Sequence, residues 1–230
     1  MSQASIPIIA IDGPGGAGKG TVARALAERL HLHLLDSGSL YRVTAFAAQA
    51  ANVDLNDTAG VAAVARGLDV DFVPGPDGVR ILLDGADVSD AVRSEKGGAA
   101  ASVVAANEAV RSALLLRQRA FARAPGLVAD GRDMGTVVFP EAGLKVFLTA
   151  SVEERARRRY KQLKDKGMDV SLPALSKDME ARDKRDSERL VAPLRAAEDA
   201  RVLDSTQLGS DAVIALIMKW AVETYPALAG

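Results

Sequence analysis

The stretch Ile6-Pro-Ile-Ile-Ala-Ile-Asp-Gly-Pro-Gly-Gly-Ala-Gly-Lys-Gly-Thr21 joins a short β-branched run to a glycine-rich segment and a lysine. The apolar run over 6–11 predicts a buried strand, and the glycines that follow it predict a tight loop. Beyond the loop, Val22, Leu26 and Leu30 repeat at i, i+4 and i+8, which predicts an amphipathic helix over 19–30. A strand, a glycine-rich loop and a helix in this order are typical of a phosphate-binding loop.

This loop has the residue types that a nucleotide triphosphate requires. Its small residues allow backbone N–H groups to point at phosphate oxygens, and the helix N-terminus adds a positive dipole end. Lys19 supplies a point charge for the β- and γ-phosphates, and a nearby hydroxyl is a ligand for Mg²⁺. Because Gly20 follows the lysine, that hydroxyl belongs to Thr21, and Asp130 is the second candidate ligand. We therefore predict ATP binding by Gly13, Pro14, Gly15, Gly16, Ala17, Gly18, Lys19, Gly20 and Thr21, with Mg²⁺ on Thr21.

Further along the chain, short apolar strands alternate with helical patterns. This alternation predicts a parallel sheet flanked by helices, with right-handed crossovers. The predicted strands after the first are 32–35, 126–130, 144–148 and 202–203, and the predicted helices after the first are about 39–51, 105–124, one from 152, 175–189 and 210–224.

A different pattern interrupts this alternation between about 62 and 102. The segment Leu68–Val73 alternates with period two, Pro74–Gly78 is a strong turn signal, and Val79–Leu83 is a second strand. We expect a small antiparallel lobe inserted into an α/β core of the P-loop type. The predicted division is a core of 1–61 and 103–230, with a helical lid at about 151–170, and an inserted lobe of 62–102.

Polar clusters follow two of the predicted strands. They are Asp36-Ser-Gly-Ser-Leu-Tyr-Arg42 and Asp130-Gly-Arg-Asp-Met-Gly135. Ligands of open α/β sheets bind outside the carboxyl ends of the strands, so both clusters are candidate ligand contacts. The structural alternatives are a helix N-cap with a surface arginine for the first cluster, and a turn with a local ion pair for the second.

Two charged segments near the C-terminal half are candidates for binding phosphate. Arg182, Asp186 and Arg189 are spaced at i, i+4 and i+7, which places them on one stripe of a helix. The segment 155–166 contains seven basic residues and one acidic residue, and its Arg155, Arg158 and Arg159 can share one helix face. A mobile arginine lid over the transferring phosphates is the functional interpretation. Solvated helices with internal salt bridges are the alternative.

Composition excludes several kinds of chemistry. The 230 residues contain no cysteine and only two histidines, so disulfides, thiolate metal sites and a cysteine nucleophile are excluded, and a histidine-based zinc cluster is not expected. The formal net charge of -1 argues against a general basic coat for nucleic acid. The apolar run 6–11 is too short for a signal or membrane segment. We expect a soluble protein in the cytoplasm, where a reducing environment suits a chain without cysteine.

With the phosphate loop, Asp36–Arg42 and the longer Asp130-Gly-Arg-Asp-Met-Gly-Thr-Val-Val-Phe-Pro140, the sequence resembles the bacterial cytidylate kinases over nearly its whole length. The segments Arg182–Arg189 and Val202–Thr206 belong to the same pattern. The resemblance implies a P-loop nucleoside monophosphate kinase. Its core sheet would bind ATP, its insert at 62–102 would lie on the monophosphate-binding side, and its lid would follow Ser151.

The resemblance also implies roles for individual residues. Catalysis would involve Lys19, Arg132, Arg155, Arg158 and Arg159. The pyrimidine would contact Ser37, Ser102, Arg111 and Asp133, the sugar would contact Arg182 and Asp186, and the acceptor phosphate would contact Arg42, Arg132 and Arg189. A carboxylate such as Asp133 suits cytosine because it accepts from the exocyclic N4 amine. The expected reaction is ATP-dependent phosphorylation of CMP and dCMP to CDP and dCDP, with Mg²⁺.

Two other functions remain open at this point. One is a kinase for another monophosphate, UMP or AMP. The other is a non-catalytic nucleotide-binding protein, or a nucleic-acid binder that uses the arginine-rich segment. Aromatic residues are 4% of the chain and that segment holds only Tyr160, which argues against base stacking on nucleic acid. The expected partners are therefore ATP, CMP and dCMP, with no nucleic acid and no membrane. A monomer is expected and no coiled-coil heptads are present, but the sequence leaves the oligomeric state open.

Overall fold

The structure is a computed structural model that describes residues 6–75 and 78–229. Its contacts divide the chain into two compact units, Met1–Asp36 with Arg119–Gly230, and Ser37–Gln118. The first unit contains the phosphate loop. The predicted insert 62–102 lies within the second unit, and its standing as a separate lobe remains a prediction.

A parallel sheet is the centre of the first unit. Its strands, in spatial order, are β2 (His33–Asp36), β6 (Leu127–Gly131), β1 (Ile8–Asp12), β7 (Leu144–Thr149) and β8 (Arg201–Asp204). Every neighbouring pair is parallel. Ile9, Ala10 and Ile11 of β1 are fully buried, as expected for a central strand that is covered on both faces. The predicted parallel sheet is therefore confirmed, and each predicted strand is found within a few residues of its expected bounds.

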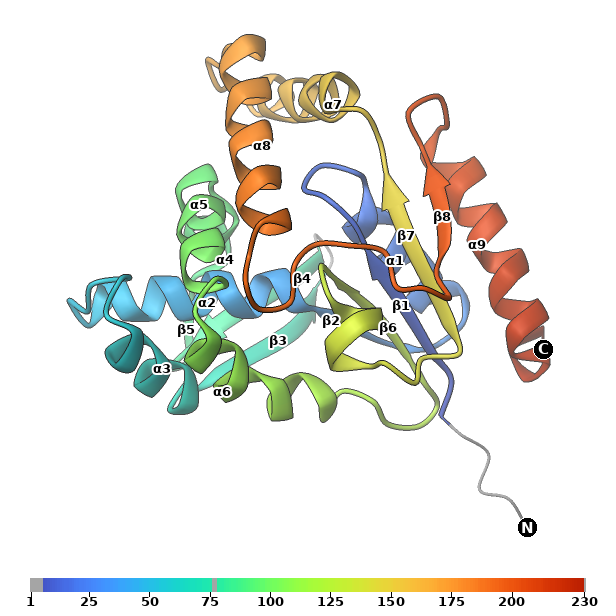
Figure 1. Ribbon diagram of the computed structural model, residues 1–230, viewed down its shortest axis with the longest axis horizontal. Helices are drawn as coiled ribbons and strands as arrows, with labels where there is room; N and C mark the ends of the chain where they lie inside the picture. The colour runs from blue at the N-terminus through green and yellow to red at the C-terminus, as the bar shows by residue number, and fades with distance from the viewer. Residues whose placement is uncertain (1–5, 76–77, 230) are drawn as a thin grey trace. The chain divides into compact units, whose positions relative to one another are not determined.

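Two helices cover one face of this sheet (Figure 1). They are α1 (Lys19–Arg29) and α9 (Ser210–Thr224), which contact each other as well as the strands. Their apolar stripes supply Val22 and Leu26 from α1 and Ile217 and Ala221 from α9 to one core with the strands. A π-helical turn, Met134–Val138, follows β6, and a short 3₁₀ helix, Pro226–Ala229, follows α9.

The helices α7 (Val152–Asp165) and α8 (Leu172–Ser187) pack together with a small core of their own. Ala156, Leu163 and Leu175 are its buried residues. The Ser151 Oγ caps α7 by accepting a hydrogen bond from the Glu154 N–H at 3.2 Å. The predicted extension of the second helix to Arg189 is wrong, because α8 ends at Ser187 and Arg189 lies just beyond it.

The second unit combines helices with an antiparallel sheet. The helices are α2 (Ser37–Ala50), α3 (Thr58–Arg66), α4 (Ser89–Arg93), α5 (Glu95–Val104) and α6 (Glu108–Arg119), of which the last residue belongs to the first unit. The sheet is β3 (Val70–Gly75), β4 (Gly78–Leu83) and β5 (Ala86–Asp87), in which Phe72 lies opposite Ile81. The predicted meander is confirmed, and residues 76 and 77 of its predicted turn lie outside the described residues.

The predicted helix 105–124 has the wrong bounds. In the structure α5 ends at Val104 and α6 begins at Glu108. Asn107 starts the new helix, because its Oδ1 accepts hydrogen bonds from the Ala109 and Val110 N–H groups at 2.9 and 3.2 Å. The helices α3, α4 and α5 had no sequence prediction, since they are short or rich in alanine and glycine and have little apolar periodicity.

Among the described residues, no single helix has both the length and the apolar character to cross a membrane. The pair Glu95–Val104 and Glu108–Arg119 meets the same length and composition test together, with a bend of 104° between them.

Candidate active site

The phosphate loop connects β1 to α1, and its backbone has a positive φ at Gly13, Gly16 and Gly18. Gly13 has φ +147°, and a Cβ on it would lie 1.9 Å from the Leu148 carbonyl oxygen of β7. Gly18 has φ +93° and is the N-cap of α1. Both conformations are strained for any residue with a side chain. The loop can therefore curl tightly against the sheet and present its amides at the N-terminus of α1.

Lys19 is buried within this loop. Its Nζ donates to the Pro14 carbonyl at 2.9 Å and lies 3.9 Å from Oδ1 of Asp130. Burial and the positive charge of Arg132 together lower the pKa of Lys19 to about 7, against the opposing effect of Asp130. An anion bound beside Lys19 would raise this pKa again, because it favours the charged form of the amine. The site therefore favours an anionic ligand.

Asp130, at the end of β6, lies beside the glycine that follows the lysine. A Cβ on Gly20 would lie 3.4 Å from Oδ2 of Asp130, so the carboxylate is close to the first turn of α1. Burial raises the pKa of Asp130 to about 6, although Lys19 opposes this rise. Thr21, the predicted metal ligand, is exposed on the first turn of α1. In the part of the chain that the structure describes, no group of three or more His, Cys, Asp or Glu residues could hold a metal ion.

Asp12 is a residue of the site that the sequence did not predict. Its Oδ1 and Oδ2 accept hydrogen bonds from the N–H groups of Met134 and Gly135, each at 2.8 Å. Burial raises the pKa of Asp12 to about 6, even though both backbone donors favour its charged form. These bonds tie the end of β1 to the π-helical turn that directly follows Arg132 and Asp133. The one sequence signal was an acidic residue at the end of an otherwise apolar strand.

Several of the predicted substrate residues lie beside the phosphate loop. A Cβ on Gly15 would be 3.5 Å from Nη2 of Arg132 and 3.7 Å from Nη1 of Arg182. Arg132 Nε also forms an ion pair with Oδ2 of Asp186 at 3.1 Å. Burial alone would raise the pKa of Asp186, but nearby Arg132, Arg182 and Arg189 together hold it below its ordinary value. The structure therefore brings these four predicted residues together, and Asp133 is buried at the start of the adjoining turn.

The three predicted lid arginines have different surroundings. Arg155 is buried, and its Nη1 donates to the Gly15 carbonyl of the phosphate loop at 2.9 Å. Its Nη2 pairs with Oδ2 of Asp183 on α8 at 2.5 Å. Arg159 donates from Nη1 to Oε1 of Gln162 at 3.2 Å. Arg155 is therefore connected to the phosphate loop by a hydrogen bond.

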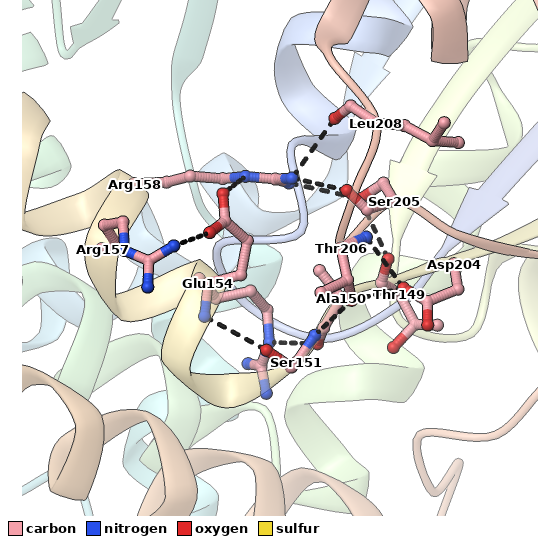
Figure 2. A network of polar contacts seen from close by, with 11 residues as sticks. Thr149, Ala150, Ser151, Glu154, Arg157, Arg158, Asp204, Ser205, Thr206 and Leu208 are labelled. Atoms are coloured by element: carbon pink, nitrogen blue, oxygen red, sulfur yellow. Dashed lines mark hydrogen bonds and ion pairs between the residues drawn. The ribbon is translucent and has the colours of Figure 1, made fainter.

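Arg158 joins α7 to the segment after β8, as Figure 2 shows. Its Nη2 donates to the Ser205 carbonyl at 2.6 Å, and its Nη1 donates to the Ser205 Oγ at 3.2 Å. Its Nε pairs with Oε1 of Glu154 at 3.0 Å, one helical turn earlier. These bonds hold the start of α7 against the chain that leaves the sheet.

The remaining predicted residues belong to the second unit. Ser37 opens α2 and donates from its Oγ to Oε1 of Gln118 at 2.9 Å. Arg42 donates from Nη1 to the Val92 and Ser94 carbonyls at 3.0 and 3.2 Å. Ser102 is buried on α5, and Arg111 is buried on α6. Gln118 is a second residue without a sequence prediction, because a lone glutamine in a helix carries no signal.

Comparisons with known proteins point to one family. A family model described as cytidylate kinase matches residues 9–223. The cytidylate kinase of Pseudomonas paraeruginosa is 60% identical over 218 residues, which cover 94% of this chain and 95% of that protein. That of Nitrosococcus oceani is 54% identical over 217 residues, with 94% and 96% covered. Among solved structures, a shikimate kinase from Acinetobacter baumannii in complex with shikimate aligns at TM-score 0.44 and 17% identity, covering 96% of this chain and 95% of that one. This structural likeness is too low to bear on function.

Proposed function

The chain belongs to the cytidylate kinase family, and on that premise we propose that it transfers the γ-phosphoryl group of ATP to CMP and dCMP, forming CDP and dCDP. The observation that carries the proposal is the identity of 60% with a cytidylate kinase over 94% of the chain. The phosphate loop, with its buried Lys19 and adjacent arginines, supports the same reaction.

The mechanism follows from the charge of the transition state. Phosphoryl transfer spreads negative charge over the transferred group and demands little covalent work from the protein. The loop amides and Lys19 bind the donor phosphates, and Arg155, which contacts Gly15, supports the loop from α7. The acceptor attacks through an oxygen of its own phosphate, which is already an anion, so no strong general base is needed. Closure of the lid would exclude water and prevent hydrolysis of ATP.

The acceptor contacts that we propose are those that the family resemblance implies. Arg132 and Arg189 in the first unit, and Arg42 in the second, would bind the acceptor phosphate. Arg182 and Asp186 would bind the sugar. The base would be recognised by Ser37, Ser102, Arg111 and Asp133. The ion pair of Arg132 with Asp186 supports this proposal, because it orients a phosphate ligand and a sugar ligand together.

Mg²⁺ is the cofactor that we propose for the donor phosphates. The Thr21 hydroxyl, in the first turn of α1, and the Asp130 carboxylate, at the end of β6 and close to Gly20, are hard oxygen donors. They fit Mg²⁺, which takes one or two protein oxygens and completes its shell with phosphate oxygens and waters. When bound, the ion would neutralise charge on the β- and γ-phosphates.

Nucleotides are therefore the proposed partners of the chain. We propose further that it functions as a monomer and that it resides in the cytoplasm, and a chain without cysteine suits that reducing compartment. Light scattering during size-exclusion chromatography will measure the mass in solution. A dimer at micromolar concentration would contradict the monomer.

An acceptor panel tests the proposed reaction. We expect CMP and dCMP to give the highest kcat/KM when each of CMP, dCMP, UMP and AMP is offered with MgATP. A preference for UMP or AMP would overturn the assignment of the acceptor.

Substitution of Lys19 tests the donor site. We expect Lys19→Ala to lower kcat by about 10²–10³-fold, the loss typical of one transition-state contact, with the fold retained by circular dichroism. Lys219→Ala, which removes an exposed lysine from α9, is the matched control and should retain full activity. A Lys19→Ala enzyme with near-normal turnover would remove Lys19 from the mechanism.

A further inference from the structure

Ser37 and Gln118 form a buried polar pair in the second unit. The Ser37 Oγ donates to Oε1 of Gln118 at 2.9 Å, and the two residues are 2% and 1% exposed. They lie 81 residues apart in sequence, at the first position of α2 and in the last turn of α6. Burial of a glutamine amide is costly unless the amide is hydrogen-bonded, so the pair needs a structural or functional reason.

A second contact between the same two helices fixes the geometry of this pair. The Arg111 guanidinium lies over the ring of Tyr41, with 5.6 Å from Cζ to the ring centroid. Tyr41 is one turn along α2 from Ser37, and Arg111 is two turns along α6 from Gln118. The helices α2 and α6 are therefore joined at two points, and the Ser37 hydroxyl is held in one orientation relative to the amide.

The direction of this hydrogen bond limits what else Ser37 can do. A serine hydroxyl has one proton to donate and two lone pairs that accept. Because the proton of Ser37 is directed at Gln118, its Oγ can only accept from a further partner. Cytosine presents an N4 amine, which donates, whereas uracil presents a carbonyl oxygen at the same position, which does not. A hydroxyl restricted to accepting thus distinguishes the two bases.

We propose that Gln118 is a positioning residue for base specificity. By binding the proton of Ser37, it converts that hydroxyl into an acceptor for an amino group and so favours cytosine over uracil. The proposal rests on the proposed function, in which Ser37 contacts the base. It adds that the preference for CMP depends on a side chain that does not itself need to touch the nucleotide.

Gln118→Met is the direct test, because methionine has a similar length and no acceptor of comparable strength. The released Ser37 proton can then point at the uracil carbonyl. We expect the ratio of kcat/KM for CMP to that for UMP to fall about tenfold or more, the effect of one hydrogen bond of about 1.4 kcal/mol. Because both rates come from one preparation, the ratio does not depend on the fraction of folded enzyme. An unchanged ratio would overturn the proposal.

Leu114→Val is the matched control for disturbed packing. Leu114 is fully buried one turn before Gln118 on α6. The shorter valine side chain weakens the packing of the same helix and leaves the hydrogen bond between Ser37 and Gln118 in place. We expect its CMP to UMP ratio to equal that of the wild type. A fall equal to that of Gln118→Met would show that packing, and not the acceptor, sets the ratio, and would overturn the proposal.

Ser37→Ala provides a test that does not depend on the stability of the Gln118 variant. If Ser37 accepts from the N4 amine, its loss lowers kcat/KM for CMP and leaves that for UMP equal or higher. If Ser37 instead donated to the O2 carbonyl, which both bases share, both values would fall together, and this outcome would overturn the proposal.

A double-mutant cycle completes the experiment. In Ser37→Ala/Gln118→Met we expect the same CMP to UMP ratio as in Ser37→Ala alone, because Gln118 acts through the hydroxyl. Independent, multiplicative effects of the two substitutions would contradict this. Failure of the proposed function would look different, since the wild-type enzyme itself would then not prefer CMP.

Discussion

Lys19 is an unfavourable residue for the stability of the unliganded protein, because it is a buried cation close to Arg132 and Arg182. Burial lowers its pKa from 10.5 to about 7. Between these two pH values the unfolded chain holds a proton that the folded chain has released, so the stability of the wild type rises with pH, by at most about 1.4 kcal/mol per pH unit. Below about pH 7 the penalty is present in full.

We therefore expect Lys19→Met to raise the free energy of unfolding while it removes activity. The gain should be largest at pH 7 and should decrease towards pH 9, because the wild-type lysine becomes neutral over that range. Urea denaturation of both proteins at the two pH values measures this difference. A gain that is the same at both values would show that Lys19 carries no such penalty.

Asp12 stabilises the turn that directly follows two of the proposed acceptor contacts, Arg132 and Asp133. We expect Asp12→Ala to lower the free energy of unfolding by about 2–5 kcal/mol, because it leaves the buried N–H groups of Met134 and Gly135 without an acceptor. The KM for CMP should also rise, since Asp133 directly precedes this turn. Asp12→Asn keeps one acceptor oxygen and should be intermediate in stability by urea denaturation. Equal stability of the two variants would contradict the role of the carboxylate.

The phosphate loop could be predicted from the sequence because its residues are consecutive, and strand, loop and helix define their own context. Asp12 and Gln118 could not be predicted, because each depends on a partner that is distant in the chain. Asp12 binds amides 122 and 123 residues away, and Gln118 binds a hydroxyl 81 residues away. No local pattern records such a pairing, so only the tertiary structure reveals it.

At the level of helices, the arginines of α7 occur in one basic run of the sequence but bind different parts of the structure. Arg155 reaches the phosphate loop and Asp183, whereas Arg158 reaches the segment after β8. Residues three apart lie about 60° apart around a helix of 3.6 residues per turn, so a run of basic residues predicts a charged face but not the separate partners of each arginine. The start of α6 was predicted about three residues too early for a similar reason, because the Asn107 cap lies in an alanine-rich stretch.

Arg158→Ala will test whether α7 restrains the segment after β8. We expect faster hydrogen exchange of the amides of Thr206 and Leu208, and a loss of about 1–3 kcal/mol in the free energy of unfolding, because the Ser205 carbonyl loses a charged donor. Arg157→Ala is the matched control. Arg157 is 71% exposed and pairs with Glu154, so its loss should change stability by less than about 0.5 kcal/mol. Equal exchange in the two variants would contradict the restraint.

Over the whole molecule, the near-zero net charge does not reveal that positive side chains are concentrated at the phosphate loop. The formal net charge is -1, which by itself argues against a binder of polyanions. Yet Lys19, Arg132, Arg155 and Arg182 all lie at or against the phosphate loop within the first unit. Charge focused at one site acts on a small anion at short range, while acidic residues elsewhere keep the total near zero. The net charge of a sequence therefore cannot exclude binding of a nucleotide.

In the first unit, hydrogen bonds join a tyrosine just after α9 to the start of β1. The Tyr225 hydroxyl, just after α9, accepts from the Ile8 N–H at 3.2 Å and donates to the Ile8 carbonyl at 3.0 Å. It also accepts from the Gly143 N–H at 2.9 Å, directly before β7. All the hydrogen-bonding capacity of a phenol is thus used to hold the starts of two neighbouring strands, β1 and β7.

Tyr225→Phe keeps the ring and removes these three bonds. We expect a loss of about 1–3 kcal/mol in the free energy of unfolding, because water can reach the partly buried backbone groups and replace some of the lost bonding. Tyr160→Phe, in the separate core of α7 and α8, is the matched control. Since Tyr225 holds the amino end of the sheet and the phosphate loop lies at the carboxyl end, kcat/KM for CMP should stay unchanged at temperatures where both variants are folded. A variant that lost activity but not stability would show that this contact serves the active site instead of the fold.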